Sequence, residues 1–325
     1  MLPRYCGRLF EKGDCIMKKF LTLLLALAMT LSLAACGSDS TEETEGTDGT
    51  EAETVDYTAM SDDELKTAIT TVSEGTLTVA TSPDFAPYEF YAIGEDGQAT
   101  LAGFEMSLAQ YIADYLGLEL EVVPMDFDGT LMELQNKSVD LGMAGYSPKP
   151  ERENIMDFSD IFYTGGQSFV TTQDKADLFA SLEDTNKAEY SIGAQTGSIQ
   201  VDLAQTNSPD AELIQLPKVT DVITDLLAGN LDGAYIETVV AETYAKNYPE
   251  LNVLLDVPYE QEGSVVGVSK GNAALLEGVN RAIAAVLEDG TMDEFITQAN
   301  ELASGETYEG LLDENGQVAE TPAEG

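Results

Sequence analysis

The sequence predicts an α/β protein, and three observations support this class. Segments that alternate apolar and polar residues, as strands do, are followed by segments with apolar residues at helical spacing. Glycines and prolines separate many of these segments. The chain has 325 residues, 43% of them hydrophobic, which is enough for about two domains with a buried core. This strand–helix–strand order is typical of parallel sheets covered by helices.

The first elements are defined by their ends. Ser61, followed three residues later by Glu64, forms a capping box that begins a short helix. A strand is predicted over 77–80, and the prolines after it make the next segment irregular. The following helix begins after Gly103 and ends at Gly117. Its apolar face comprises Phe104, Leu108, Tyr111, Ile112, Tyr115 and Leu116.

The remaining elements continue the alternation. We expect strands near 118–122, 140–145, Phe169, Ser191, 233–236 and 265–269, and helices near 130–135, from Ser198, and over 219–228, 273–287 and 292–303. Segments 134–141 and 226–233 also resemble each other. Each places a helix end, a polar turn and a hydrophobic residue followed by Asp at the same spacing. Two similar α/β halves would explain this repeat.

Composition excludes several classes of function. The formal charge of -44 repels the phosphate backbone, so no nucleic-acid partner is expected. The chain has no His, which removes the commonest metal ligand and proton shuttle. We find no metal-ligand cluster, phosphate-binding loop or nucleophile–His pair. The sequence therefore predicts no enzyme activity, no metal and no cofactor.

The N-terminal region predicts export. Met17 is followed by two lysines and by an apolar run over 20–35, shorter than the roughly 20 residues that span a membrane. The run ends in Leu33-Ala34-Ala35-Cys36, which resembles a bacterial lipoprotein signal with Cys36 as the lipid attachment site. An uncleaved anchor helix is the alternative. We expect a lipid-anchored, extracytoplasmic protein, suited to a Gram-positive surface.

The regions that flank the folded part have their own composition. Acidic residues interrupt residues 1–16, so we expect Met17 to be the true start and 1–35 to be upstream sequence plus signal peptide. Residues 36–60 and 305–325 are acidic and poor in apolar side chains, which predicts a disordered tether and a disordered tail.

Several short motifs occur in the order in which they occur in a known family. They are Gly75-Thr-Leu-Thr-Val-Ala-Thr, Phe85-Ala-Pro87-Tyr88-Glu-Phe90, Gly103-Phe104-Glu105, Asp126-Phe127-Asp128, Glu151-Arg152 and Asp157-Phe158-Ser159-Asp160. The series resembles the extracellular solute-binding proteins, family 3, of polar amino-acid ABC transporters. The resemblance implies a bilobal type II periplasmic-binding-protein-like fold with two hinge strands. One lobe would comprise 61–165 plus 263–304 and the other 166–262, with Gly165-Gly166 and Glu262-Gly263 at the crossings.

Arg152 is the first candidate for ligand binding. From Cys36 onward the chain has only two arginines, and this one follows the rigid turn Pro148-Lys149-Pro150-Glu151. A guanidinium binds a carboxylate through two parallel hydrogen bonds. The alternative is a surface arginine paired with Glu151 or Glu153. The resemblance implies that Arg152 holds the α-carboxylate of an amino acid.

The resemblance assigns further residues to the ligand's head group. Gly145 and Ser147 would surround it, and Gly197 and Ser198 begin a helix whose free N–H groups suit a carboxylate, although Gly197 also fits an ordinary tight turn. Glu237, at the carboxyl end of a predicted strand, would receive the ammonium group. Ile199 stands where some relatives carry a hydroxyl residue.

Aromatic residues would line the rest of the cleft. Phe85, Tyr88 and Phe127 match positions that stack on the ligand, but Tyr88 could equally belong to the core. Ser82 replaces the Asp found in relatives that prefer cationic amino acids, while Asp84 could reach the pocket by another route.

Together with the lipoprotein signal, the resemblance implies a monomeric binding lipoprotein. It would capture a polar, zwitterionic and neutral amino acid and deliver it to the permease of an ABC importer. The alternative is a hydrolyase or lyase on the same fold, with Glu237 as the acid.

Overall fold

The structure is a computed structural model that describes residues 55–94, 97–260, 263–305 and 307–308. The predicted signal region (1–35), the lipid attachment site Cys36 and most of the tether and tail lie outside the described residues.

The first sheet has the strand order β5-β1-β6-β13-β7. Its strands are β5 (Glu119–Pro124), β1 (Thr76–Thr81), β6 (Leu141–Gly142), β13 (Gly267–Ser269) and β7 (Met156–Phe158). The first three are parallel, and β13 runs antiparallel to both of its neighbours. Since β13 follows the other strands by more than a hundred residues, the chain leaves this sheet and returns to it.

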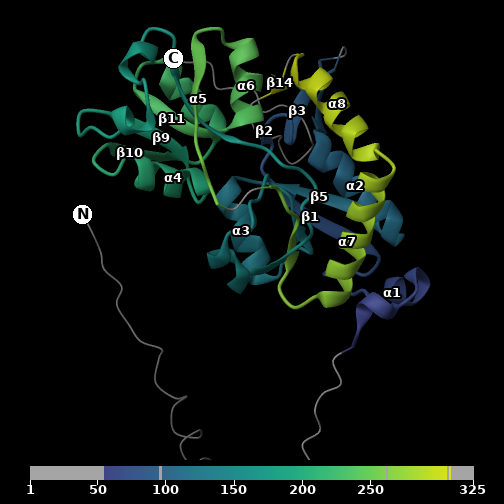
Figure 1. The fold of residues 1–325 in the computed structure, drawn as a ribbon. Helices are drawn as coiled ribbons and strands as arrows, with labels where there is room; N and C mark the ends of the chain where they lie inside the picture. The colour runs from purple at the N-terminus through teal and green to yellow at the C-terminus, as the bar shows by residue number, and fades with distance from the viewer. Residues whose placement is uncertain (1–54, 95–96, 261–262, 306, 309–325) are drawn as a thin grey trace, which may run out of the picture. The chain divides into compact units, whose positions relative to one another are not determined.

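Helices cover both faces of the first sheet, as Figure 1 shows. One group is α2 (Phe104–Leu116), α7 (Ala273–Glu288) and α8 (Thr291–Ala303), which pack on one another, and α3 (Phe127–Asn136) packs against β1, β6 and β13. The predicted apolar face of α2 is confirmed in part, because Phe104, Leu108 and Ile112 are fully buried. The left-handed Gly117 ends this helix as predicted.

The second sheet repeats this arrangement in the order β10-β9-β11-β8-β12. Its strands are β10 (Glu212–Leu216), β9 (Ser191–Gln195), β11 (Gly233–Glu237), β8 (Gln167–Thr172) and β12 (Leu251–Asp256). Again the first three are parallel and the fourth is antiparallel. Its helices are α4 (Ile199–Asn207), α5 (Val219–Leu227) and α6 (Thr238–Asn247). The two sheets with their helices confirm the predicted bilobal α/β fold, and we call them the first and second lobe.

The predicted internal repeat has a structural counterpart. In the first lobe, Asp140 exchanges hydrogen bonds with Thr78, its N–H donating to Thr78 O and its Oδ2 accepting from Thr78 N. In the second lobe, Asp232 does the same with Ser191. Asp140 directly precedes β6 and binds β1, and Asp232 directly precedes β11 and binds β9. Each lobe is therefore stabilised internally by the same pair of hydrogen bonds.

A small third sheet was not predicted. It has the order β14-β3-β2, with β4 paired to β3. Its strands are β2 (Asp84–Phe85), β3 (Glu89–Ile93), β4 (Ala99–Ala102) and β14 (Thr307–Tyr308). The segment after the prolines is thus strand rather than irregular. Because β14 pairs with β3, the start of the predicted disordered tail at 305–325 is ordered.

The predicted tether also ends earlier than expected. Residues 57–59 form a 3₁₀ turn, η1 (Tyr57–Ala59), instead of a disordered segment. Arg281 on α7 donates to Tyr57 O and Thr58 O and pairs with Asp62 of α1 (Asp62–Ala68). The first turn of α1 has the predicted capping box of Ser61 and Glu64.

Two segments connect the lobes and pair with each other. Tyr163, between β7 and β8, forms an antiparallel bridge with Ser264, between β12 and β13. The predicted crossing residues Gly165, Gly166 and Gly263 lie beside this bridge, and Glu262 lies outside the described residues. Among the described helices, none has the length and apolar character that crossing a membrane requires.

Candidate functional site

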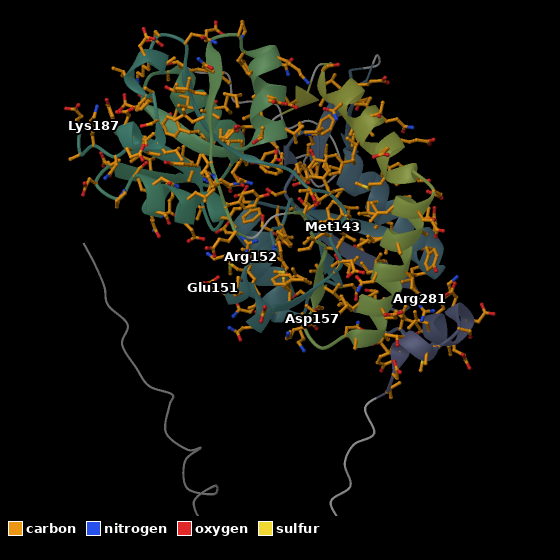
Figure 2. The ribbon with its side chains drawn as sticks, viewed as in Figure 1. Met143, Glu151, Arg152, Asp157, Lys187 and Arg281 are labelled. Atoms are coloured by element: carbon orange, nitrogen blue, oxygen red, sulfur yellow. The ribbon has the colours of Figure 1, made fainter. Side chains whose placement is uncertain are left out.

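Arg152 lies at the junction of the two lobes. It belongs to η2 (Pro150–Asn154), a 3₁₀ turn whose first residue is the rigid Pro150. Only 5% of Arg152 is exposed. Its Nη1 donates to Ser147 O of the first lobe at 3.3 Å, and its Nη2 donates to Gly197 O of the second lobe at 3.0 Å. Figure 2 shows it well separated from Arg281, which lies beside α1.

The Arg152 guanidinium has no carboxylate counter-ion among the described residues. Glu151 and Glu153 are exposed and do not bind it, so the alternative of a surface ion pair is wrong. The rings of Phe127 and Tyr146 lie 5.5 and 5.6 Å from its central carbon. Burial lowers the pKa of Arg152, and the charges of Tyr146, Asp202 and Glu151 oppose that shift.

Arg152 opens onto a cavity between the lobes, which we call the interlobe cavity. The first lobe contributes Phe85, Phe127, Ala144, Gly145, Ser147 and Arg152, and the second contributes Gln195, Ser198, Ile199 and Gln200. Its volume is about 10 Å³. That holds about one water molecule, whereas small-molecule pockets measure roughly 300–1,000 Å³. This is a closed conformation, so a ligand can enter only when the lobes separate.

The structure brings six of the ten predicted ligand-binding residues onto the wall of the cavity. They are Phe85, Phe127, Gly145, Ser147, Arg152 and Ser198. The other four, Ser82, Tyr88, Gly197 and Glu237, are not among the wall residues. Gly197 still contacts the site, because its carbonyl accepts from Arg152.

Ser82 and Tyr88 are committed to protein contacts. Ser82 donates to Asp84 Oδ1 at 2.7 Å. The Tyr88 ring is 1% exposed and packs against Phe104 and Tyr163 at centroid distances of 4.3 and 5.5 Å. Tyr88 therefore has the core position that was the alternative in the sequence.

Glu237 ends β11 and caps the next helix, since its Oε2 accepts from Val240 N at 2.9 Å. Its Oε1 has only a long bond of 3.4 Å from the Tyr88 hydroxyl. Burial raises the pKa of Glu237 to about 7, which the bonds from Val240, Val239 and Tyr88 oppose. A cation beside Oε1 would favour the ionised carboxylate.

Four wall residues were not predicted as ligand-binding residues: Ala144, Gln195, Ile199 and Gln200. Gln195 and Gln200 flank the Gly197-Ser198 turn at the start of α4. Because that helix start was itself predicted, the polar residues on either side of it were a signal that could have identified them.

Several contacts join the two lobes around the cavity. Lys149 of the first lobe pairs with Asp202 on α4 at 2.5 Å. Asp84 on β2 accepts from two groups of the second lobe, Val219 N at 2.6 Å and Gln195 Nε2 at 3.2 Å. Because Val219 is the first residue of α5, a carboxylate of one lobe caps a helix of the other.

A buried pair of carboxyl groups supports the cavity wall from the first lobe. Glu89 and Glu105 are both fully buried, and the two oxygens of Glu105 accept from Gly145 N at 3.2 Å each. Gly145 has a φ of 61° and lies so near the Phe85 ring that a Cβ would be 2.6 Å from it. Only glycine fits there. Within the described part of the chain, no group of three acidic or Cys side chains could hold a metal ion.

Two α/β lobes joined by paired crossing segments, with a cavity at their junction, are the architecture of a solute-binding protein. The chain belongs to the bacterial extracellular solute-binding proteins, family 3, whose sequence model matches residues 77–299. Family membership implies an extracytoplasmic location.

The arginine-binding extracellular protein ArtP of Bacillus subtilis is 30% identical over 282 residues, which cover 86% of this chain and 96% of ArtP. The crystal structure of the amino acid ABC transporter substrate-binding protein AbpA from Streptococcus pneumoniae, bound to L-arginine, is also similar. Its TM-score is 0.68 at 32% identity, with 72% of this chain and 98% of AbpA covered. Cyclohexadienyl dehydratase of Pseudomonas aeruginosa is 26% identical over 180 residues, which cover 55% of this chain and 66% of the dehydratase.

Proposed function

We propose that this protein captures a free amino acid between its lobes by hinge closure and delivers it to the permease of an ABC importer. One observation carries the proposal: the Arg152 guanidinium is buried at the lobe junction without a carboxylate partner in the described residues. A buried charge is costly unless it is paired. The α-carboxylate of an amino acid supplies the missing anion in bidentate geometry.

The ammonium group of the ligand would face Glu237. The Oε1 atom of Glu237 lacks a strong donor, and the pKa of about 7 means that an adjacent cation would return the carboxyl group to its ionised form. Opening of the lobes at the Gly165-Gly166 and Glu262-Gly263 crossings would admit the ligand. Its contacts to both lobes would then favour closure, because only the closed form offers them all.

The substrate is a polar amino acid. A neutral zwitterion remains our prediction from the sequence, since Ser82 does not supply a carboxylate to the cavity and Asp84 is bound to other protein groups. ArtP, which is described as arginine-binding, and AbpA, which was crystallised with L-arginine, add a cationic amino acid as a second possibility.

Lipid attachment at Cys36 would keep the protein beside its permease. Two or three acyl chains hold a protein on a membrane stably, whereas one chain alone is marginal. We propose that the protein acts as a monomer, without metal or cofactor.

The test is a thermal-shift screen of the twenty amino acids, followed by calorimetry on variants. A ligand at 100 times its Kd should stabilise the native protein by about 2.7 kcal/mol. We expect Arg152→Ala to weaken binding of that ligand more than 100-fold while the fold is kept, because the ligand carboxylate would be left buried and unpaired. Arg281→Ala is the matched control, since it removes the other arginine of the described region, far from the cavity, and should leave the affinity unchanged. Undiminished binding by Arg152→Ala would contradict the proposal.

A second candidate function is a lyase or hydrolyase of a small carboxylate, with Glu237 as the acid. The raised pKa of Glu237 and the similarity to a dehydratase favour it. Mass spectrometry of the ligand after prolonged incubation distinguishes the two functions. Recovery of unchanged ligand supports transport, and a dehydrated or decarboxylated product would establish the enzyme.

A further inference from the structure

The amide of Gln195 has a fixed orientation in the wall of the interlobe cavity. Gln195 is the last residue of β9 and is 5% exposed. Its Nε2 donates to Asp84 Oδ2 and to Pro217 O, both at 3.2 Å. Since both partners are oxygen acceptors, only the NH₂ end of the amide can face them. The carbonyl oxygen, Oε1, therefore points away from them, and no described residue donates to it.

Asp84 increases the acceptor strength of that oxygen. The Asp84 carboxylate accepts from Gln195 Nε2, from Val219 N and from the Ser82 hydroxyl. A donor bound to a carboxylate polarises the whole amide, which adds negative charge to Oε1. Asp84 is in the first lobe and Gln195 in the second, so this polarised acceptor is oriented only when the lobes are closed.

The rest of the cavity wall contains no competing cation. Arg152 is its only charged residue, and Phe85, Phe127 and Ile199 are apolar. A ligand whose α-carboxylate occupies Arg152 therefore places its side chain among apolar groups and the amides of Gln195 and Gln200.

We propose that Gln195 determines specificity by accepting a hydrogen bond from the ligand side chain through Oε1, so that the cleft selects amino acids whose side chains end in N–H donors. Asp84 acts as its positioning residue. This inference rests on the proposed function and narrows its substrate class. An aliphatic side chain would leave Oε1 without a hydrogen-bond donor when the lobes close. A carboxylate side chain would be repelled by Oε1 and by the Asp84 carboxylate next to it.

The test is calorimetry with L-arginine, L-glutamine, L-glutamate and L-norleucine. We expect the unmodified protein to bind arginine or glutamine at least about tenfold more tightly than norleucine or glutamate, because an unpaired buried acceptor costs about 1–3 kcal/mol. Gln195→Met preserves length and removes the amide. It should weaken binding of the preferred ligand about 10- to 100-fold and leave norleucine within about threefold, which also shows that the variant folds and closes.

Two further variants separate the roles. Gln200→Met is the matched control, because Gln200 lines the same cavity but its Nε2 donates to the neutral amide oxygen of Gln167, at 2.7 Å, and not to a carboxylate, so its Oε1 is the weaker acceptor. It should affect the preferred ligand less than Gln195→Met does. Asp84→Asn should reduce the factor by which the preferred ligand binds more tightly than norleucine. A loss of stability alone would weaken both ligands equally and leave this factor unchanged.

Three results would overturn the inference while leaving amino-acid capture intact. They are tightest binding of glutamate or norleucine by the unmodified protein, equal weakening of all four ligands by Gln195→Met, and equal effects of Gln195→Met and Gln200→Met. Failure of every amino acid to bind the unmodified protein would instead refute the proposed function itself, and the inference with it.

Discussion

At the scale of single residues, the most unusual groups are the two buried carboxyls behind the cavity wall. Burial raises the pKa of Glu105 to about 7, although the bond from Gly145 N opposes the shift. The pKa of Glu89 lies well above its usual value, from burial and from the charges of Glu105 and Asp84. No described cation pairs with either. Glu89 therefore favours its protonated form at neutral pH, whereas Glu105, which accepts from Gly145 N, loses its proton near pH 7.

The Glu105 pKa predicts how stability changes with pH. Because the folded protein binds this proton more tightly than the unfolded chain, the stabilisation is complete below the unfolded pKa of about 4.5 and is lost as the pH rises through about 7. The free energy of unfolding in urea should fall between pH 5 and 8, and Glu105→Gln should reduce that fall by at least about 1 kcal/mol. The exposed Glu119→Gln is the control. Parallel pH profiles for Glu105→Gln and the unmodified protein would contradict this assignment.

At the scale of elements, each lobe is held together by an aspartate that binds a neighbouring strand. Asp140 accepts from Thr78 N and Val72 N, and is almost fully buried. Asp232 accepts from Ser191 N and also pairs with Lys175 at 2.9 Å. These bonds fix β1 at Thr78 and the start of β9 at Ser191, and β9 ends at Gln195 in the cavity wall.

Both aspartates should matter for stability. Asp140→Asn and Asp232→Asn each replace charge-assisted hydrogen bonds with weaker neutral ones. If the Asn NH₂ group faces the backbone N–H, two donors oppose each other and the hydrogen bond is lost. We expect each to lower the free energy of unfolding by about 1–3 kcal/mol. The exposed Asp174→Asn should change it by less than about 0.5 kcal/mol. Urea denaturation measures all three, and an unchanged Asp140→Asn would argue against the repeat as a structural device.

At the scale of the whole described unit, closure brings charges of the two lobes together. The Lys149–Asp202 pair joins the lobes, whereas the Lys270–Asp157 pair lies within the first lobe. Side chains of both pairs are partly exposed, so each pair contributes only about 0.2–1 kcal/mol.

Removal of the interlobe pair should therefore act on ligand release. We expect Lys149→Gln to speed release up to about fivefold at low salt, with the difference shrinking in 0.5 M salt, about three to four times the physiological ionic strength. Lys270→Gln is the matched control and should leave the rate unchanged. Stopped-flow measurement of ligand release at the two salt concentrations checks this. Equal effects of both variants would show that the Lys149–Asp202 pair does not stabilise the closed form.

Much of the fold could be predicted because periodicity and end signals are local. The apolar face and the left-handed glycine define α2, and Ser61 with Glu64 defines the start of α1. β14 could not be predicted in this way, since it reaches β3 from more than two hundred residues away. β2, β3 and β4 pair locally and were missed because the prolines around them predicted an irregular segment. The order of strands in both sheets likewise depends on pairings between distant segments.

The sequence by itself determined the α/β class and the repeated halves, and it made Arg152 the first candidate for ligand binding, because apolar period, caps and a scarce residue type are properties of the chain read in order. Only the tertiary structure decided which side chains share the cavity. Gln195 became a wall residue through its contact with the other lobe, and Tyr88 a core residue through packing against Phe104 and Tyr163 within its own lobe. No local pattern encodes contacts between such distant segments.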